Sequence, residues 1–550
     1  MAFRLKAVTA TLCTLSLFAV APGAIADEPL HVRIDRMIEA QADGSLSPLS
    51  DDGEFLRRVY LDLAGRIPSS VEAREFFADA DEEKRPKVID RLLASEEYPR
   101  RMAQMFDVML MERRGGHEEW KKFLENSFTA NKPWDQIVRE ILTPDAEDED
   151  TRGAALFYTK RLERYGQQAS DMPGLIRDIG RLFLGVDVQC AQCHDHLFID
   201  DYKQVDYQGL FAFVGQTFIR RDKQFPAVGE NPLNKEIEFA SVFEMVPTTT
   251  GPRLPFGESV AVPTFTRGEE YEVPPDEQKK TPGVLKFSPL RILGEQLPRA
   301  DNRAFTHNIA NRLWWVMMGR GIVHPLDLNH SSNPPTHPEL LDMMADELAA
   351  HALDMKWFLR ELALSEVYQR SSLLPDDAKG PEEISPDGYR VALERPLSAE
   401  QLLHSTLWAS GEWERVTSTQ ETTENTDDES TEPTFDELTE RFRGALANPP
   451  KEPEIEISPT IKAALFMSND EVVLSWLTPR DRNLIDRLAK IEDAGVVAEE
   501  LYLSVLSRLP SEVERVEVGE HLAKTGDRRA DALGHLAWAL LTSTEFCVNH

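Results

Sequence analysis

Apolar residues recur every three or four positions along much of the chain, which is the spacing of one face of an α-helix. Several of these stretches are bounded by helix signals, such as Pro86 in an expected first turn and Gly185 and Gly319 at expected ends. The pattern predicts a mainly α-helical protein. It is clearest over residues 55–63, 88–93, 120–128, 175–183, 305–316, 340–362 and 501–550.

The pattern changes between the two helical parts. Ten prolines lie between Pro226 and Pro289, too many for a long helix, and residues 259–262 alternate as a short strand would. We therefore predict two helical domains, residues 27–224 and 296–550, joined by a proline-rich connector or small β subdomain at 225–295. Residues 417–440 carry nine acidic residues and no basic one, which favours a disordered or looped insertion.

Residues 1–26 have the pattern of a secretory signal. Arg4 and Lys6 precede an apolar run over 7–20, and Ala24 and Ala26 supply small residues before a cleavage point. A short membrane anchor is the alternative, but the run is shorter than a bilayer needs. We expect export to the periplasm, the cell surface or the medium, and a mature chain that does not span a membrane.

Charge and cysteine content narrow the function classes. The chain has 61 basic and 95 acidic residues, a formal charge of −34, which argues against nucleic acid as a partner. Apolar residues make up 41%, too many for a chain disordered throughout. Four cysteines exclude a disulfide-rich scaffold, and Cys13 lies within the expected signal.

Residues 190–194 read Cys-Ala-Gln-Cys-His, the attachment spacing of c-type haem. Two thiols at this spacing, Cys190 and Cys193, can bond the two vinyl groups on one edge of the porphyrin. His194 then lies under the iron as its proximal ligand. The motif predicts haem c as cofactor, and covalent attachment suits an exported protein.

Other interpretations of the pair remain open. Zinc could bind Cys190 and Cys193 with His194 or His196, although a further ligand must come from elsewhere. The two cysteines could also form a disulfide, or their spacing could be a coincidence. Asp195 and His196 are expected to support the site or line its wall. The candidates for a sixth iron ligand are Met317, Met318, His307, His324, His330 and His337.

Two further groups have structural interpretations. Arg57, Arg58 and Asp62 share a short helix, which favours a buried ion-pair network. His337, before Pro338, is expected to start a helix.

Several segments of the chain resemble known families. Residues 55–68, 84–98 and 188–213 resemble the planctomycete cytochrome c-like domain of unknown function. Residues 311–323, 337–342, 365–372, 395–400, 501–514 and 538–546 resemble the planctomycete-specific C-terminal domain that usually follows it. The resemblance covers roughly 50–215 and 300–550. It implies an exported protein of a planctomycete-type lineage, often linked to surface or polysaccharide metabolism. Members often carry a histidine where this chain has residues 315–318, Trp-Val-Met-Met.

The leading hypothesis is an exported mono-haem c-type protein that transfers electrons or performs haem redox chemistry. Its redox partner or small-molecule substrate is not specified by the sequence, nor is enzymatic activity. The alternatives are a zinc- or other metal-dependent enzyme acting on extracellular polymers, and a non-catalytic acidic scaffold.

Overall fold

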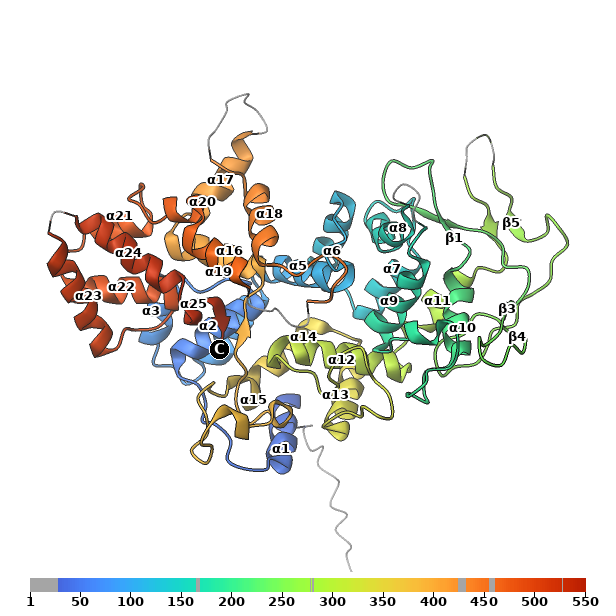
Figure 1. Ribbon diagram of the computed structural model, residues 1–550, viewed down its shortest axis with the longest axis horizontal. Helices are drawn as coiled ribbons and strands as arrows, with labels where there is room; N and C mark the ends of the chain where they lie inside the picture. The colour runs from blue at the N-terminus through green and yellow to red at the C-terminus, as the bar shows by residue number, and fades with distance from the viewer. Residues whose placement is uncertain are drawn as a thin grey trace, which may run out of the picture.

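The computed structural model describes residues 28–550 except 165–168, 277, 279–280, 424–431, 455–459 and 527. The predicted signal, residues 1–26, and the middle of the acidic insertion lie outside the described residues. Within them the predicted mainly α-helical fold is confirmed (Figure 1). None of the described helices combines the length and apolar character needed to cross a bilayer.

The N-terminal part is a succession of helices whose starts are set by local caps. Asp51 accepts a hydrogen bond from the backbone N–H of Glu54, and Ser69 and Glu72 form a capping box. The elements are α1 (Leu30–Gln41), α2 (Asp52–Leu63), α3 (Ser70–Ala78), α4 (Lys84–Leu93), α5 (Glu97–Met111), α6 (Glu118–Thr129), α7 (Trp134–Leu142), η1 (Arg152–Ala155), α8 (Leu156–Leu162), α9 (Met172–Leu184), η2 (Gln189–Gln192) and α10 (Gln204–Val214).

Helices return from Pro289, before the end of the predicted connector at residue 295. His337 occupies the expected start of α13, and Gly319 ends α12 with φ of 80°. The elements are α11 (Pro289–Gln296), α12 (Arg303–Met318), α13 (Pro338–Ala350), α14 (Met355–Leu364), α15 (Glu366–Gln369), η3 (Pro381–Glu383), η4 (Pro386–Gly388), α16 (Ala399–Ser410), α17 (Trp413–Thr423), α18 (Phe435–Leu446), α19 (Ile461–Asn469), α20 (Glu471–Ser475), α21 (Leu484–Ala489), α22 (Ala494–Leu506), α23 (Glu512–Thr525), α24 (Arg529–Leu541) and α25 (Thr544–Cys547).

The described strands form two-stranded antiparallel sheets, and most lie in or beside the connector. The pairs are β1 (Thr217–Ile219) with β2 (Val228–Glu230), β3 (Ile237–Phe239) with β4 (Thr248–Thr250), β5 (Tyr271–Val273) with β6 (Val284–Leu285), and β7 (Arg395–Pro396) with β8 (Val548–Asn549).

The strand predicted at residues 259–262 is wrong. Val260 donates one backbone hydrogen bond to the carbonyl of Pro252, and no strand forms there. Pro252, Pro255 and Pro263 lack the N–H groups that a ladder between these segments would need.

The acidic insertion predicted at 417–440 is helical at both described ends, since α17 continues to Thr423 and α18 begins at Phe435. Thr434 and Glu437 form a capping box, and Leu438 and Phe442 are buried in a hydrophobic core. Burial of this apolar face supplies the stability that the acidic composition alone did not indicate.

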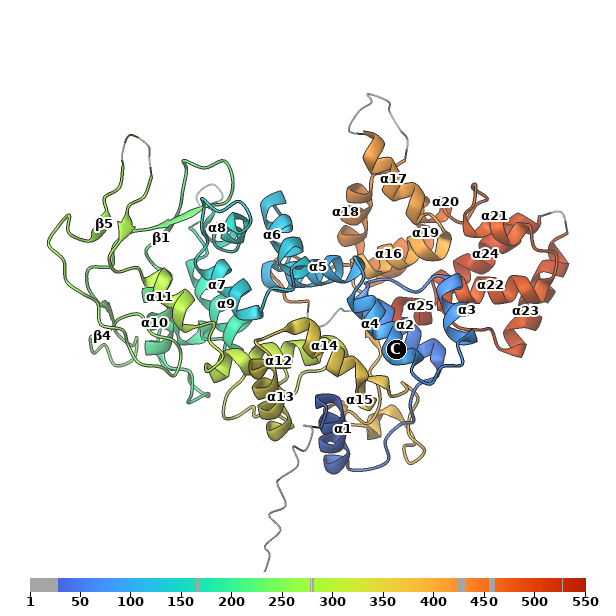
Figure 2. The ribbon, with the colours of Figure 1, turned by 180° about the vertical axis from the view of Figure 1, so that it is seen from behind.

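The described residues form two hydrophobic cores, and both draw on distant parts of the chain. The first core combines residues from α1 to α10 with residues from α11 to α14. The second joins Leu61 and Ile67 to residues between 397 and 546. Accordingly, α2 and α3 lie beside the C-terminal helices in both views (Figures 1 and 2), and α3 contacts α22. The proline-rich segment therefore does not separate the two cores.

The predicted network of Arg57, Arg58 and Asp62 is present in part. All three are buried, Arg58 pairs with Glu54 at 2.7 Å, and Asp62 pairs with Arg395 at 3.0 Å. Arg57 instead donates to backbone carbonyls, including that of Phe546 at 2.7 Å. Helix α2 is thereby tied to the last residues of the chain.

Candidate functional site

The C-terminal end of α9 places the Cys-Ala-Gln-Cys-His motif. Gly185 has φ of 70° and its N–H donates to the Arg181 carbonyl at 3.1 Å, which ends the helix. Asn308 of α12 donates to the Leu182 carbonyl at 2.7 Å, so a second helix satisfies the same end. The chain then leads into η2, where the Asp187 carboxylate accepts from the Gln189 N–H at 3.0 Å.

The two cysteines of the motif are exposed to solvent, and its histidine is half-buried. Cys190 and Cys193 are exposed free thiols, whereas Ala191 between them is buried and anchors the turn. Nδ1 of His194 lies 2.5 Å from the carbonyl oxygen of Asp195. Because a carbonyl only accepts, Nδ1 carries the proton, and Nε2 of the neutral ring keeps its lone pair for a metal.

Exposed apolar side chains lie on two segments next to the motif, the loop that follows it and the segment after β3, and we call this set the apolar rim. Phe198 is 85% exposed and Met245 is 78% exposed. The segment after β3 contacts the motif directly, since the Val242 N–H donates to the Cys193 carbonyl at 3.1 Å and the Phe243 and His194 rings lie 4.7 Å apart. The rim consists of Leu197, Phe198, Val242, Phe243, Met245 and Val246.

The two neighbours named from the sequence have local partners. Asp195 accepts from the N–H of Gln204 at 2.9 Å and lies 3.3 Å from Lys203, so it holds the start of α10. Nδ1 of His196 accepts from the N–H of Ile199 at 3.0 Å. Both residues therefore shape the loop that follows the motif.

The candidate axial ligands fall into two groups. Met317 and Met318 are buried in the first core, and His337 is buried with its ring 5.5 Å from that of Tyr389. Burial lowers the pKa of His337. His330, in contrast, lies 5.5 Å from the ring of Tyr202, which in turn lies 6.1 Å from the ring of His196. The structure thus brings His330 near the motif's loop and leaves Met317 and His337 in packed positions.

Among the described residues, no group of three or more His, Cys, Asp or Glu side chains is placed to hold a metal ion.

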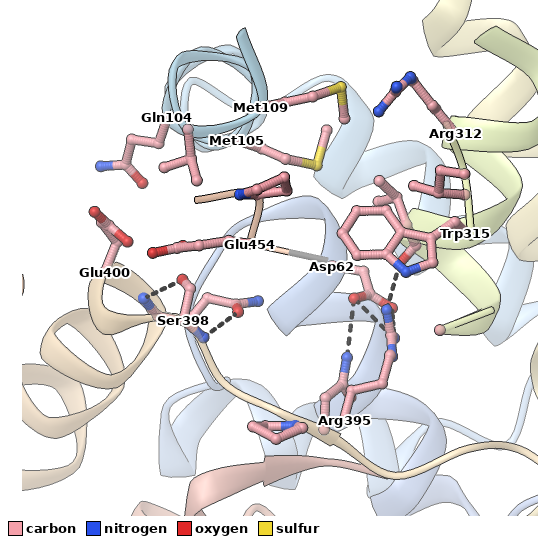
Figure 3. A pocket seen from close by; sticks show the side chains of 18 of the residues that line it. Asp62, Gln104, Met105, Met109, Arg312, Trp315, Arg395, Ser398, Glu400 and Glu454 are labelled. Carbon is pink, nitrogen blue, oxygen red and sulfur yellow. Dashed lines mark hydrogen bonds and ion pairs between the residues drawn. The ribbon is translucent and has the colours of Figure 1, made fainter. Parts of the chain in front are cut away.

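A second candidate site is a cavity of about 350 Å³ where segments far apart in the sequence meet (Figure 3). Helices α5, α9 and α12 supply one part of its wall, and the segment from β7 to the start of α16 supplies another. In Figure 3, Met105, Met109 and Trp315 lie around the same space as Asp62, Arg395 and Glu400.

Most charges in the cavity wall are paired. Asp62 accepts from Arg395, from the Tyr368 hydroxyl at 2.9 Å and from Asn549 at 2.9 Å. Burial opposes ionisation of Glu400, but hydrogen bonds and charge from Arg113, with the charge of Arg443, lower its pKa to about 2. Glu400 is therefore held ionised. Its partners, and those of Asp62, hold both carboxylates in fixed positions.

A buried ion network links the cavity to α9, the helix that precedes the motif. Arg181 of α9 lines the cavity and pairs with Asp178 at 3.0 Å and with Asp327 at 2.9 Å. Asp327 also pairs with Arg312 of α12. Because breaking a buried pair leaves an uncompensated charge, this network fixes α9 against α12.

Sequence reasoning did not identify the cavity as a site. The signal was present, because Asp62, Arg312, Gly319, Arg395 and Glu400 all fall in segments that carried the family resemblance. Their spacing along the chain offered no indication that they meet.

Two regions of the chain match known family models. Residues 33–218 match the family PSCyt2, described as a protein of unknown function (DUF1549), and residues 291–522 match PSD1, described as a protein of unknown function (DUF1553). No curated protein and no solved structure matches the chain. The chain thus contains two regions similar to domains of unknown function, DUF1549 followed by DUF1553.

Proposed function

We propose that this protein is an exported c-type haem protein of a planctomycete-type lineage that transfers electrons or performs haem redox chemistry. Cys190 and Cys193 hold the haem, and His194 is the proximal iron ligand. One observation carries the proposal: two exposed free thiols three residues apart precede a histidine whose Nδ1 is already engaged.

The chemistry of the motif fits the group. Each thiol can add across one vinyl double bond, with sulfur bonding one carbon and hydrogen the other, so attachment needs no oxidant. The hydrogen bond from His194 Nδ1 to the Asp195 carbonyl orients the ring and leaves Nε2 for iron. When bound, haem supplies an iron centre that cycles between two oxidation states.

The apolar rim supports the same proposal. Exposed aromatic and aliphatic side chains are costly in water unless something covers them. Leu197, Phe198 and Phe243 belong to segments next to the motif, and their exposed side chains would supply apolar contacts to a bound haem. Covalent attachment also agrees with the proposed export, because an exported protein would otherwise lose its haem.

The test is expression of the full chain in a bacterium that has a c-type haem attachment system. We expect a Soret band in the purified protein and haem that stays on the chain through a denaturing gel. Cys190→Ser with Cys193→Ser should abolish the covalent haem. Cys547→Ser, which changes a cysteine outside the motif, should retain it. His194→Ala should alter the spectrum if any haem remains.

A colourless protein from that host would contradict the proposal. Zinc found by elemental analysis would favour a metal-dependent enzyme, and a Cys190–Cys193 disulfide found by mass spectrometry would favour a thiol site.

A further inference from the structure

We propose that the cavity between α5, α12 and the start of α16 binds a small organic anion. Its acidic group pairs with Arg101, and its apolar part lies against Met105, Met109 and Trp315. This inference does not depend on whether the motif carries haem.

One face of α5 forms the side of the cavity that carries Arg101. Residues Arg101, Met105, Val108, Met109 and Glu112 line the cavity and recur at helical spacing. The opposite face of α5 buries Met102, Phe106 and Leu110 in the first core, among other residues. The helix is therefore held by its core face, and the other face is available to a ligand.

Arg101 differs from the other arginines of the wall. Arg181 and Arg312 pair with Asp327, and Arg395 pairs with Asp62. Within the described part of the chain, Arg101 makes one hydrogen bond, from Nε to the Asp62 carbonyl at 3.4 Å, and no ion pair. Its two terminal nitrogens thus remain available as donors.

The position of Arg101 is set by the backbone beneath it. Gly65 has φ of 75°, and a Cβ added there would lie 2.9 Å from Cδ of Arg101. The absence of a side chain at Gly65 lets the arginine lie against the turn after α2. Gly319 accommodates Arg395 in the same way, with an added Cβ 2.6 Å from its Cδ.

The surrounding carboxylates do not neutralise Arg101. Asp62 pairs with Arg395, and Glu400 and Glu454 share Arg113. Glu112 pairs with Arg181, and Glu394 is exposed to solvent. Burial lowers the pKa of Arg101, with Asp62 and Glu400 opposing that effect from a distance. A half-buried cation without a direct ion-pair partner favours an anionic ligand, because pairing with the ligand offsets its lost hydration.

The rest of the cavity wall indicates the size and polarity of the part of the ligand that does not contact Arg101. Met105, Met109, Trp315 and Leu326 give an apolar surface, and methionine side chains adapt to ligands of varied shape. The volume of about 350 Å³ lies at the lower end of the range for small-molecule sites. A carboxylate or sulfonate on an aromatic or aliphatic body matches both properties.

The experiment measures binding of the fluorescent probe anilinonaphthalene sulfonate to the full chain, with neutral N-phenylnaphthylamine as the uncharged counterpart. Arg101→Gln should weaken sulfonate binding at least about tenfold, the effect of losing a charged hydrogen-bonded pair. Binding of the neutral probe should be unchanged. Arg101→Lys should show an intermediate loss, because it keeps the charge but not the forked donor.

The matched control is Arg100→Gln. Arg100 is the preceding residue of α5, and its side chain is 64% exposed. Its replacement should leave sulfonate affinity unchanged, and thermal unfolding of each variant checks that the fold is kept.

Three outcomes would overturn the inference. They are no saturable sulfonate binding to the unmodified chain, equal affinity of Arg101→Gln and Arg100→Gln, and loss of binding on Phe198→Ser but not on Arg101→Gln. The last would place the probe on the apolar rim.

Discussion

At the scale of residues, a few side chains have roles that their neighbours in the sequence do not share. Arg100 and Arg101 are adjacent, but one lies in solvent and the other lines a cavity. Cys190 and Cys193 are exposed, whereas Cys547 is partly buried. In each case the amino acid is the same but its surroundings differ. What a residue can do therefore depends on its burial and on its hydrogen-bond and ion-pair partners.

Glu230 gives a prediction on pH at the same scale. It accepts from the Ser288 hydroxyl at 2.6 Å and from the Leu290 N–H at 2.9 Å, and so ties β2 to the start of α11. Burial raises its pKa to about 7, although these hydrogen bonds oppose the shift. The folded state therefore holds the proton more tightly than the unfolded state does. Its contribution to stability is full below 4.5 and is lost as the pH rises to about 7.

Glu230→Gln should remove this dependence, because an amide mimics the protonated acid. We expect the variant to gain stability relative to the unmodified protein as the pH rises through that interval, measured as urea unfolding midpoints. Parallel pH profiles for the two proteins would show that Glu230 does not titrate as inferred.

At the scale of elements, helix ends decide where the candidate chemistry lies. Helix α9 ends at Gly185, and a Cβ there would lie 3.1 Å from the Asn308 side-chain oxygen. The left-handed backbone and the close packing of α12 both require glycine. If α9 ended elsewhere, the chain would enter η2 from a different position and direction, and the two thiols would be displaced.

Two glycine substitutions should have opposite effects on stability. Gly185→Ala should lower the free energy of unfolding by about 1–2 kcal/mol, because alanine is strained in the left-handed region. Gly444 lies inside α18, and an added Cβ meets no atom within 4 Å. Gly444→Ala should therefore raise the free energy of unfolding by about 0.5–1 kcal/mol.

Urea denaturation of the two variants beside the unmodified protein checks both signs. A neutral effect of Gly185→Ala would mean that the end of α9 adapts more readily than its contacts indicate.

At the scale of the whole molecule, the two family regions are packed into each other. The first core spans both regions, and the second core takes Leu61 and Ile67 from the first region. Arg57 and Arg58 of α2 donate to carbonyls of residues 545–550 and 368–370. The cavity exists only because these distant segments meet.

Fragments of the chain should reflect this packing. We expect residues 28–224 expressed alone to aggregate or to unfold without cooperativity, because each core would lose part of its apolar surface to water. Co-expression with residues 225–550 should restore a soluble complex that co-purifies. Cooperative thermal unfolding of the isolated 28–224 fragment, followed by circular dichroism, would contradict the expectation.

The sequence by itself determined the helical class and the positions of most helices, because periodicity and capping are local. The sequence also showed the spacing of the Cys190–His194 motif, since the motif consists of five adjacent residues. The strand expected at 259–262 does not form, and the described ends of the loop expected at 417–440 are helical, because hydrogen-bond partners and buried surface come from elsewhere. Only the tertiary structure decided that Arg101, Trp315 and Glu400 share one cavity, since no local rule relates residues that lie so far apart in the sequence.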